Sequence, residues 1–227
     1  MTTDNIPTAD PSATAEDAPP PVDSGAFLDL PDALAQLAAM DRPTLVNAAS
    51  RAVGSARANP TALSLARLGV LRRGLLMANE REALAMCLGA QGQLALLLGD
   101  FALAATAFDS LWGTRELLGQ PWRAHEARLA FAEATALTGD TAGAERLLTA
   151  AMGPARELAR TGEVARASAL LADTLALLAA VLEHVGRTDE ATLWREGAVD
   201  MAPDADSRDR VLARTLEVSG GGAPRQL

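Results

Sequence analysis

The chain has 227 residues, a formal net charge of −9 and 20 basic residues, all of which are arginine. The absence of lysine excludes a Walker-type phosphate loop, a Schiff base and a lysine general base. The acidic balance argues against nucleic acid as the ligand of the whole chain. Hydrophobic residues make up 49% of the chain but aromatic residues only 3%. Alanine and leucine dominate and favour helices, whereas strand-forming residues are scarce, so we predict an all-α fold.

Both ends of the chain are predicted to lie outside the folded part. Residues 1–26 are acidic and contain too little apolar surface to offset the entropy of ordering, so we expect a disordered N-terminal tail. Residues 219–227 contain three consecutive glycines and are expected to form a flexible tail. The sequence shows no signal-peptide pattern and no uninterrupted apolar run of membrane-spanning length. With Cys87 as the lone cysteine, we expect a cytoplasmic protein without a disulfide or membrane span.

Between these tails, short polar breaks separate helical runs. Asp41-Arg42-Pro43 has the pattern of an N-cap with proline in the first turn, and Asn79-Glu80-Arg81-Glu82 resembles a capping box. The breaks divide the chain into an arginine-rich N-terminal helical cap or degenerate repeat (27–79) and a series of repeats with a C-terminal capping helix (80–218). The expected helices cover residues 27–40, 43–58, 60–78, 80–98, 101–118, 121–138, 141–160, 163–185, 188–201 and 204–217.

A glycine followed five residues later by alanine recurs after three of these runs. The glycines are Gly99, Gly139 and Gly186, so the copies are spaced by 40 and then 47 residues. A recurring period of this size is typical of stacked helical hairpins. The small residues in each copy allow the helices of a pair to approach closely. The signature residues are Gly92, Gly99 and Ala104 in the first copy, Ala132, Gly139 and Ala144 in the second, and Ala179, Gly186 and Ala191 in the third.

These triplets resemble the tetratricopeptide repeat, in which a small residue, a turn glycine and an alanine occur at the same spacings. The resemblance covers residues 80–203, and the repeats are longer than the family's usual 34 residues. It implies a right-handed superhelical array of antiparallel helix pairs, with about ten helices in this chain. It also implies a concave groove lined by the first helix of each pair, which binds a partner protein.

The groove positions that the resemblance implies are largely acidic or apolar. Basic residues that would hold a partner's carboxylate are absent from them, so we expect an apolar or arginine-bearing partner segment. The array would thus serve as a scaffold or adaptor for protein–protein interaction. The predicted groove residues are Met86, Gln93, Glu126, Leu129, Glu133, Asp173 and Leu177.

The arginines are concentrated near the N-terminus. Residues 42–79 carry six arginines and no acidic residue, whereas the 41 residues before them carry eight acidic residues and no basic one. This block is either a solvated face, an attachment surface for the acidic tail or a second copy, or a site for nucleic acid. The alternative function is therefore a regulator whose array binds a small ligand or nucleic acid. The candidate anionic-partner patch comprises Arg51, Arg57, Arg67, Arg72 and Arg73.

No pattern of catalytic or metal-ligating residues is recognisable. His125 and His184 are far apart and do not form a zinc-binding motif, so both are expected on the surface or in the groove. The chain also lacks a Gly-x-Ser-x-Gly nucleophile motif. We therefore expect no enzymatic activity, no metal and no cofactor. Trp112 and Trp122 flank the Gly119-Gln120-Pro121 turn and either fill gaps between helices or contribute to binding.

Overall fold

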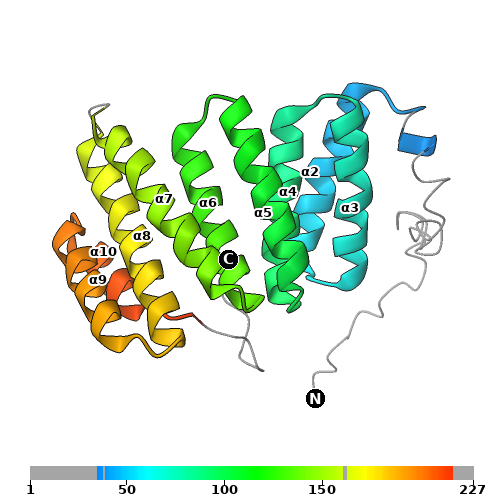
Figure 1. The fold of residues 1–227 in the computed structure, drawn as a ribbon. Coiled ribbons are helices and arrows are strands. Elements are labelled where there is room, and N and C mark those ends of the chain that lie inside the picture. Colours follow the sequence, from blue (N-terminus) through cyan, green and yellow to red (C-terminus); the bar gives the residue numbers. More distant parts are fainter. Residues whose placement is uncertain (1–34, 38, 161–162, 217–227) are drawn as a thin grey trace, which may run out of the picture.

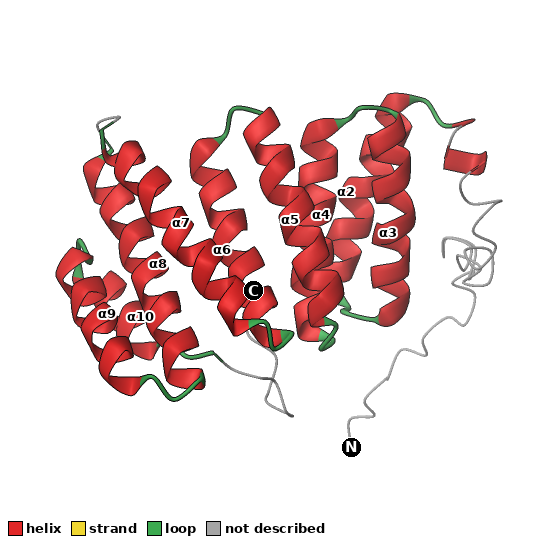
Figure 2. Ribbon diagram, in the orientation of Figure 1, coloured by secondary structure: helices red, strands yellow, loops and turns green. Residues whose placement is uncertain are grey.

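The computed structural model describes residues 35–37, 39–160 and 163–216, and in these residues it contains helices and no strand (Figure 2). The all-α fold is confirmed, and the helix bounds lie close to those expected. The predicted tails, residues 1–26 and 219–227, lie outside the described residues. The helices are α2 (Arg42–Ala58), α3 (Ala62–Met77), α4 (Arg81–Leu97), α5 (Phe101–Leu117), α6 (Pro121–Leu137), α7 (Thr141–Ala159), α8 (Val164–His184), α9 (Thr188–Met201) and α10 (Ala205–Ala213).

The helices form an array in which each one packs against the next along the chain (Figure 1). The even-numbered helices also contact one another where α2 meets α4, α6 meets α8 and α8 meets α10. Short connections make consecutive helices antiparallel. The even-numbered helices therefore follow one side of the array and the odd-numbered helices the other.

The turns at the ends of the successive helices α3 to α6, which we call corners, share one backbone conformation and recur once per helix. Asn79, Gly99, Gly119 and Gly139 follow one another at intervals of 20 residues, and each has a positive φ. At Gly99 the helix closes with hydrogen bonds from Gly99 N to Leu96 O (3.1 Å) and from Asp100 N to Ala95 O (2.9 Å). This left-handed closure requires glycine or asparagine, because other side chains are strained there. Gly186 adopts the same conformation, with φ of 80°.

One expectation for these corners is wrong. Asn79 does not begin a helix as the first residue of a capping box, because it closes α3 in the left-handed conformation with φ of 57°. Glu80 takes the N-cap position of α4 and makes no side-chain capping hydrogen bond. The aspartates that follow Gly99 and Gly139 each cap the next helix. The carboxylate of Asp100 accepts from Leu103 N at 3.0 Å, and that of Asp140 accepts from Gly143 N at 2.8 Å.

Small residues occupy the places where neighbouring helices approach most closely. Ala104, Ala144 and Ala191 have no exposed surface. At Gly92, a Cβ atom would come within 2.6 Å of the Phe108 ring, closer than two carbon atoms can approach without displacement. The residues that the sequence pattern singled out therefore set the distance between α4 and α5 and between the corresponding helices further along the array.

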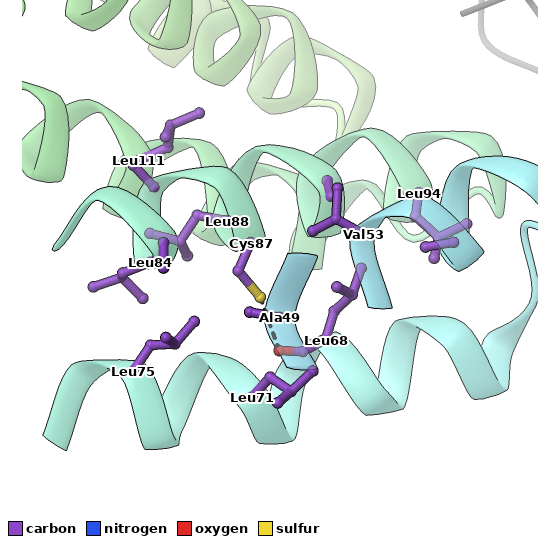
Figure 3. Packing of buried hydrophobic residues seen from close by; sticks show 14 of the residues in the cluster. Ala49, Val53, Leu68, Leu71, Leu75, Leu84, Cys87, Leu88, Leu94 and Leu111 are labelled. Carbon is purple, nitrogen blue, oxygen red and sulfur yellow. Dashed lines mark hydrogen bonds between the residues drawn. The ribbon is translucent and has the colours of Figure 1, made fainter. Parts of the chain in front are cut away.

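Leucine and alanine fill the core, and Cys87 is part of it. The first core cluster joins α2 to α6, and Figure 3 shows Cys87 among its leucines. The Cys87 thiol donates to Leu68 O at 3.3 Å, and burial raises the pKa of Cys87 to about 12. The residue thus acts as a small apolar side chain.

Helix α8 is the most apolar helix of the described chain. By length and composition it could cross a membrane, but 61% of its most apolar window is buried inside the array. It packs against α6, α7, α9 and α10 and contributes Leu177, Leu178 and Leu182 to the second core cluster. Contacts with its neighbours therefore account for its apolar composition.

The close approach at Gly92 predicts opposite effects for two glycine-to-alanine substitutions. Gly92→Ala forces the Phe108 ring to move and should destabilise the fold by about 1–2 kcal/mol. At Gly113, in the interior of α5, an added Cβ would meet no atom within 4 Å, so Gly113→Ala should stabilise by about 0.5–1 kcal/mol. Urea unfolding of both variants measures the difference. Equal effects of the two substitutions would contradict this account of the packing.

Candidate binding surfaces

The predicted groove residues lie on α4, α6 and α8, and they differ in exposure. Gln93 and Glu126 are exposed, while Met86 and Leu129 are half-buried. Leu177 has no exposed surface, so it cannot contact a partner in this structure. The reason is that α8 is surrounded by four helices, which turns a position expected to face the groove into a core position.

Glu133 and Asp173, which we name with Glu126 the acidic face, meet arginines from the end of the chain. Arg214 Nη2 lies 2.7 Å from Glu133 Oε2, although the two residues are 81 positions apart. Burial raises the pKa of the Asp173 carboxyl, and the nearby charges of Arg210 and Arg214 act in the opposite direction. The sequence predicted a capping helix here but not that its arginines would reach these carboxylates.

The segment that carries Arg214 is fixed to the array by several contacts. Val211 of α10 is 1% exposed, and Leu216 packs against the second core cluster. Arg195 of α9 donates to the carbonyl oxygens of Leu212 and Arg214 at 3.3 Å and 3.2 Å. The C-terminal segment, residues 205–216, thus carries its arginines to the acidic face in a defined position.

Glu126, the remaining member of the acidic face, also faces an arginine. Arg166 Nη2 of α8 lies 3.8 Å from Glu126 Oε1, and the Arg166 guanidinium lies 4.8 Å from the centre of the Trp122 ring. All three carboxylates therefore have an arginine close to them.

The residues of the predicted anionic-partner patch are on α2 and α3. Arg51, Arg57 and Arg73 are exposed, whereas Arg67 and Arg72 are half-buried. The exposed members are available to solvent, and the role of the patch stays a prediction.

A pocket of about 470 Å³ lies where the end of α5, the start of α6 and the end of α7 meet, and we call it the α5–α7 pocket. Pro154 stands inside α7 at this point and has no N–H to continue the helical hydrogen bonds. The α6 residues in the pocket are centred about 140° around the helix from the acidic face. The lining residues are Trp112, Glu116, Gly119, Gln120, Pro121, Ala124, His125, Arg128, Pro154, Glu157 and Leu158.

His125 lines this pocket and is only 3% exposed, so the expectation of a surface or groove position is wrong for it; His184 is exposed, as expected. The Nε2 atom of His125 lies 3.1 Å from Thr174 Oγ1. Thr174 donates its single hydroxyl hydrogen to Leu170 O at 2.7 Å, so its oxygen accepts a hydrogen from Nε2. Burial lowers the pKa of His125 to about 4, so at neutral pH the ring is uncharged and Nδ1 is its acceptor nitrogen, and Nδ1 has no partner among the described residues.

Trp112, Glu116 and Arg128 form a connected group at the wall of the pocket. The indole Nε1 of Trp112 donates to Glu116 Oε1 at 2.7 Å, and the Arg128 guanidinium lies 4.6 Å from the centre of the Trp112 ring. Burial lowers the pKa of Arg128 and Glu116 opposes this effect. Because a guanidinium remains charged in proteins, the stack is a cation–π contact.

Trp112 and His125 both stand out in the sequence, but no pattern there indicates that they lie together. They come from different helices, and the pocket that both line also depends on where the end of α7 lies. The turn at Gly119 and the proline within α7 are the signals that bear on this site.

The described residues contain no group of three or more histidine, cysteine, aspartate and glutamate side chains that could hold a metal ion. Comparison of the chain with family models, curated proteins and solved structures found no match. Any functional conclusion therefore rests on the acidic face, the arginine patch and the α5–α7 pocket themselves.

Burial of neutral His125 predicts a loss of stability in mild acid. Desolvation, with a smaller contribution from Arg128, lowers the pKa of His125 from 6.5 to about 4. Between these values the unfolded chain binds a proton that the folded chain does not, so stability falls as the pH falls through this window. From pH 7 to pH 5 the effect should be about 2 kcal/mol.

Urea unfolding at both pH values, on wild type and on His125→Gln, isolates this contribution because glutamine does not titrate. The wild type should lose about 2 kcal/mol more than the variant. Parallel losses in the two proteins would show that His125 is not the group responsible.

Proposed function

We propose that the chain is a tetratricopeptide-like scaffold whose acidic face binds an arginine-bearing segment of a partner protein. The observation that carries the proposal is the pair between Arg214 and Glu133, with Asp173 beside it. An arginine-bearing segment already occupies this face, in the form of the chain's own C-terminal segment. The face is therefore suited in shape and charge to the class of ligand that the sequence predicts.

The repeat architecture supports this function in a second way. The helical array repeats at regular corners and presents the acidic residues of α6 and α8 from a stiff support. Arrays of stacked helical hairpins offer extended surfaces of this kind to partners. Half-buried carboxylates on such a surface discriminate between ligands, because an apolar segment without an arginine would leave them without a counter-charge.

The proposal implies that the C-terminal segment and a partner compete for the same carboxylates. The segment is attached to the array, so it acts at a high effective concentration. A partner arginine has to displace Arg214 from Glu133 in order to bind.

Weakening the internal competitor should therefore strengthen binding in trans. The probe is a labelled peptide with the sequence of residues 208–216, compared by fluorescence anisotropy with the same peptide in which glutamine replaces every arginine. The full-length Arg214→Ala variant should bind the arginine peptide about threefold to tenfold more tightly than wild type. The Arg208→Ala variant, which changes an exposed arginine of α10, is the matched control and should bind like wild type.

Glu133→Gln tests the receiving side of the same contact. In the Arg214→Ala background, Glu133→Gln should remove the preference for the arginine peptide over the glutamine peptide, since the charge that selects arginine is gone. Equal binding of the two peptides by the Arg214→Ala protein, or tighter binding of an acidic peptide, would contradict the proposal.

A further inference from the structure

Arg128 is the charged group of the α5–α7 pocket that its neighbours leave without an acceptor. No ion pair or hydrogen bond joins its guanidinium to another residue in the described part of the chain, and its Nε is buried without a partner. The guanidinium instead lies over the ring of Trp112, at 4.6 Å from its centre. Stacking on an aromatic face fixes the plane of a guanidinium and leaves the N–H donors along its edge free.

Each of the other ionisable side chains of the pocket has a hydrogen-bond or ion-pair partner among the described residues. Burial lowers the pKa of Arg128, and the nearby charge of Glu116 raises it. Glu116 accepts the indole hydrogen of Trp112 at 2.7 Å. Glu157 pairs with Arg160 at 2.6 Å. His125 is buried and neutral, with its Nε2 bonded to Thr174, so it brings no charge to the pocket. Arg128 is thus the charged residue of the pocket whose N–H donors remain available to a ligand.

The remaining walls are apolar. Pro121 and Ala124 come from α6, and Pro154 and Leu158 come from α7. With a volume of about 470 Å³, the pocket falls within the range of sites that hold small organic molecules. Such a molecule would bury an apolar body against these residues and direct a polar group towards Arg128.

We propose that the α5–α7 pocket binds a small organic carboxylate, with its apolar body between α6 and α7 and its carboxylate on the edge of the Arg128 guanidinium. A planar carboxylate can accept two parallel hydrogen bonds from a guanidinium, and these charge-assisted bonds are stronger than neutral ones. The pocket lies on a different side of α6 from the acidic face. This second site does not depend on the proposed binding of an arginine-bearing partner.

Calorimetry with two probes of nearly equal shape tests the proposal on the full-length chain. Phenylacetate carries the carboxylate, and phenylacetamide replaces it with a neutral amide. Wild type should bind phenylacetate about tenfold more tightly than phenylacetamide. Arg128→Gln should lower the affinity for phenylacetate by about tenfold and remove the preference between the probes.

Two further variants make the result specific. Arg123→Gln changes an exposed arginine on the same helix and should leave both affinities unchanged. Arg128→Lys keeps the charge but loses the planar pair of donors, so its affinity for phenylacetate should lie between those of wild type and Arg128→Gln. Circular dichroism of each variant establishes that it is folded, and the lysine variant decides the matter if the glutamine variant does not fold.

Three outcomes would overturn the proposal. Equal affinity of wild type for the acid and the amide would show that Arg128 does not select the ligand. Failure of phenylacetate to bind at concentrations up to about 10 mM would exclude a carboxylate site of useful affinity. A peptide that ends in phenylalanine presents the same chemistry on a longer chain. Tighter binding of this peptide than of phenylacetate would assign the pocket to the C-terminus of a protein instead of a small molecule.

Discussion

The close approach of neighbouring helix backbones is the constraint on which the rest of the structure depends. Gly92 has no space for even a methyl group beside Phe108, and the alanines at the corresponding positions are fully buried. Small residues at these positions bury little area themselves, but they let the leucines of adjacent helices interdigitate. The left-handed corners complete the constraint, because they turn the chain back within two or three residues and so bring each helix onto the one before it.

The sequence is informative where structure is local. Glycine and aspartate at the corners of the chain indicate the ends of α4 and α6 and the caps that follow them, since both effects act within a few residues. The same reasoning is wrong for Asn79, because asparagine can start a helix or close one and the neighbouring residues alone do not decide. Gly119 carries a weaker signal for a related reason, since it lacks the aspartate that follows Gly99 and Gly139.

The candidate binding surfaces depend on contacts that no local pattern encodes. Glu133 and Arg214 are separated by most of the array's second half, and their pairing requires the position of α10 over α8. The position of His125 depends on Thr174, 49 residues away. Helical periodicity places both Glu133 and His125 on α6 with the correct spacing but does not tell which side of the helix a neighbour will cover. For the same reason the repeat pattern places Leu177 in the groove, although four helices enclose α8.

Helix α6 links the two surfaces, because it carries the acidic Glu126 and Glu133 on one side and His125 and Arg128 on another. Hydrogen bonds to a residue of α8 and to a residue of the C-terminal segment hold α6 at two points along its length. Near its start, His125 is bonded to Thr174 in the interior, and near its end Glu133 is paired with Arg214. Rotation of α6 about its axis would break the contacts of His125 with Thr174 and of Glu133 with Arg214. It would also expose Ala132, which has no accessible surface. The single helix therefore holds two chemically different surfaces in a fixed relation: one presents carboxylates that pair with arginines, and the other presents a stacked guanidinium.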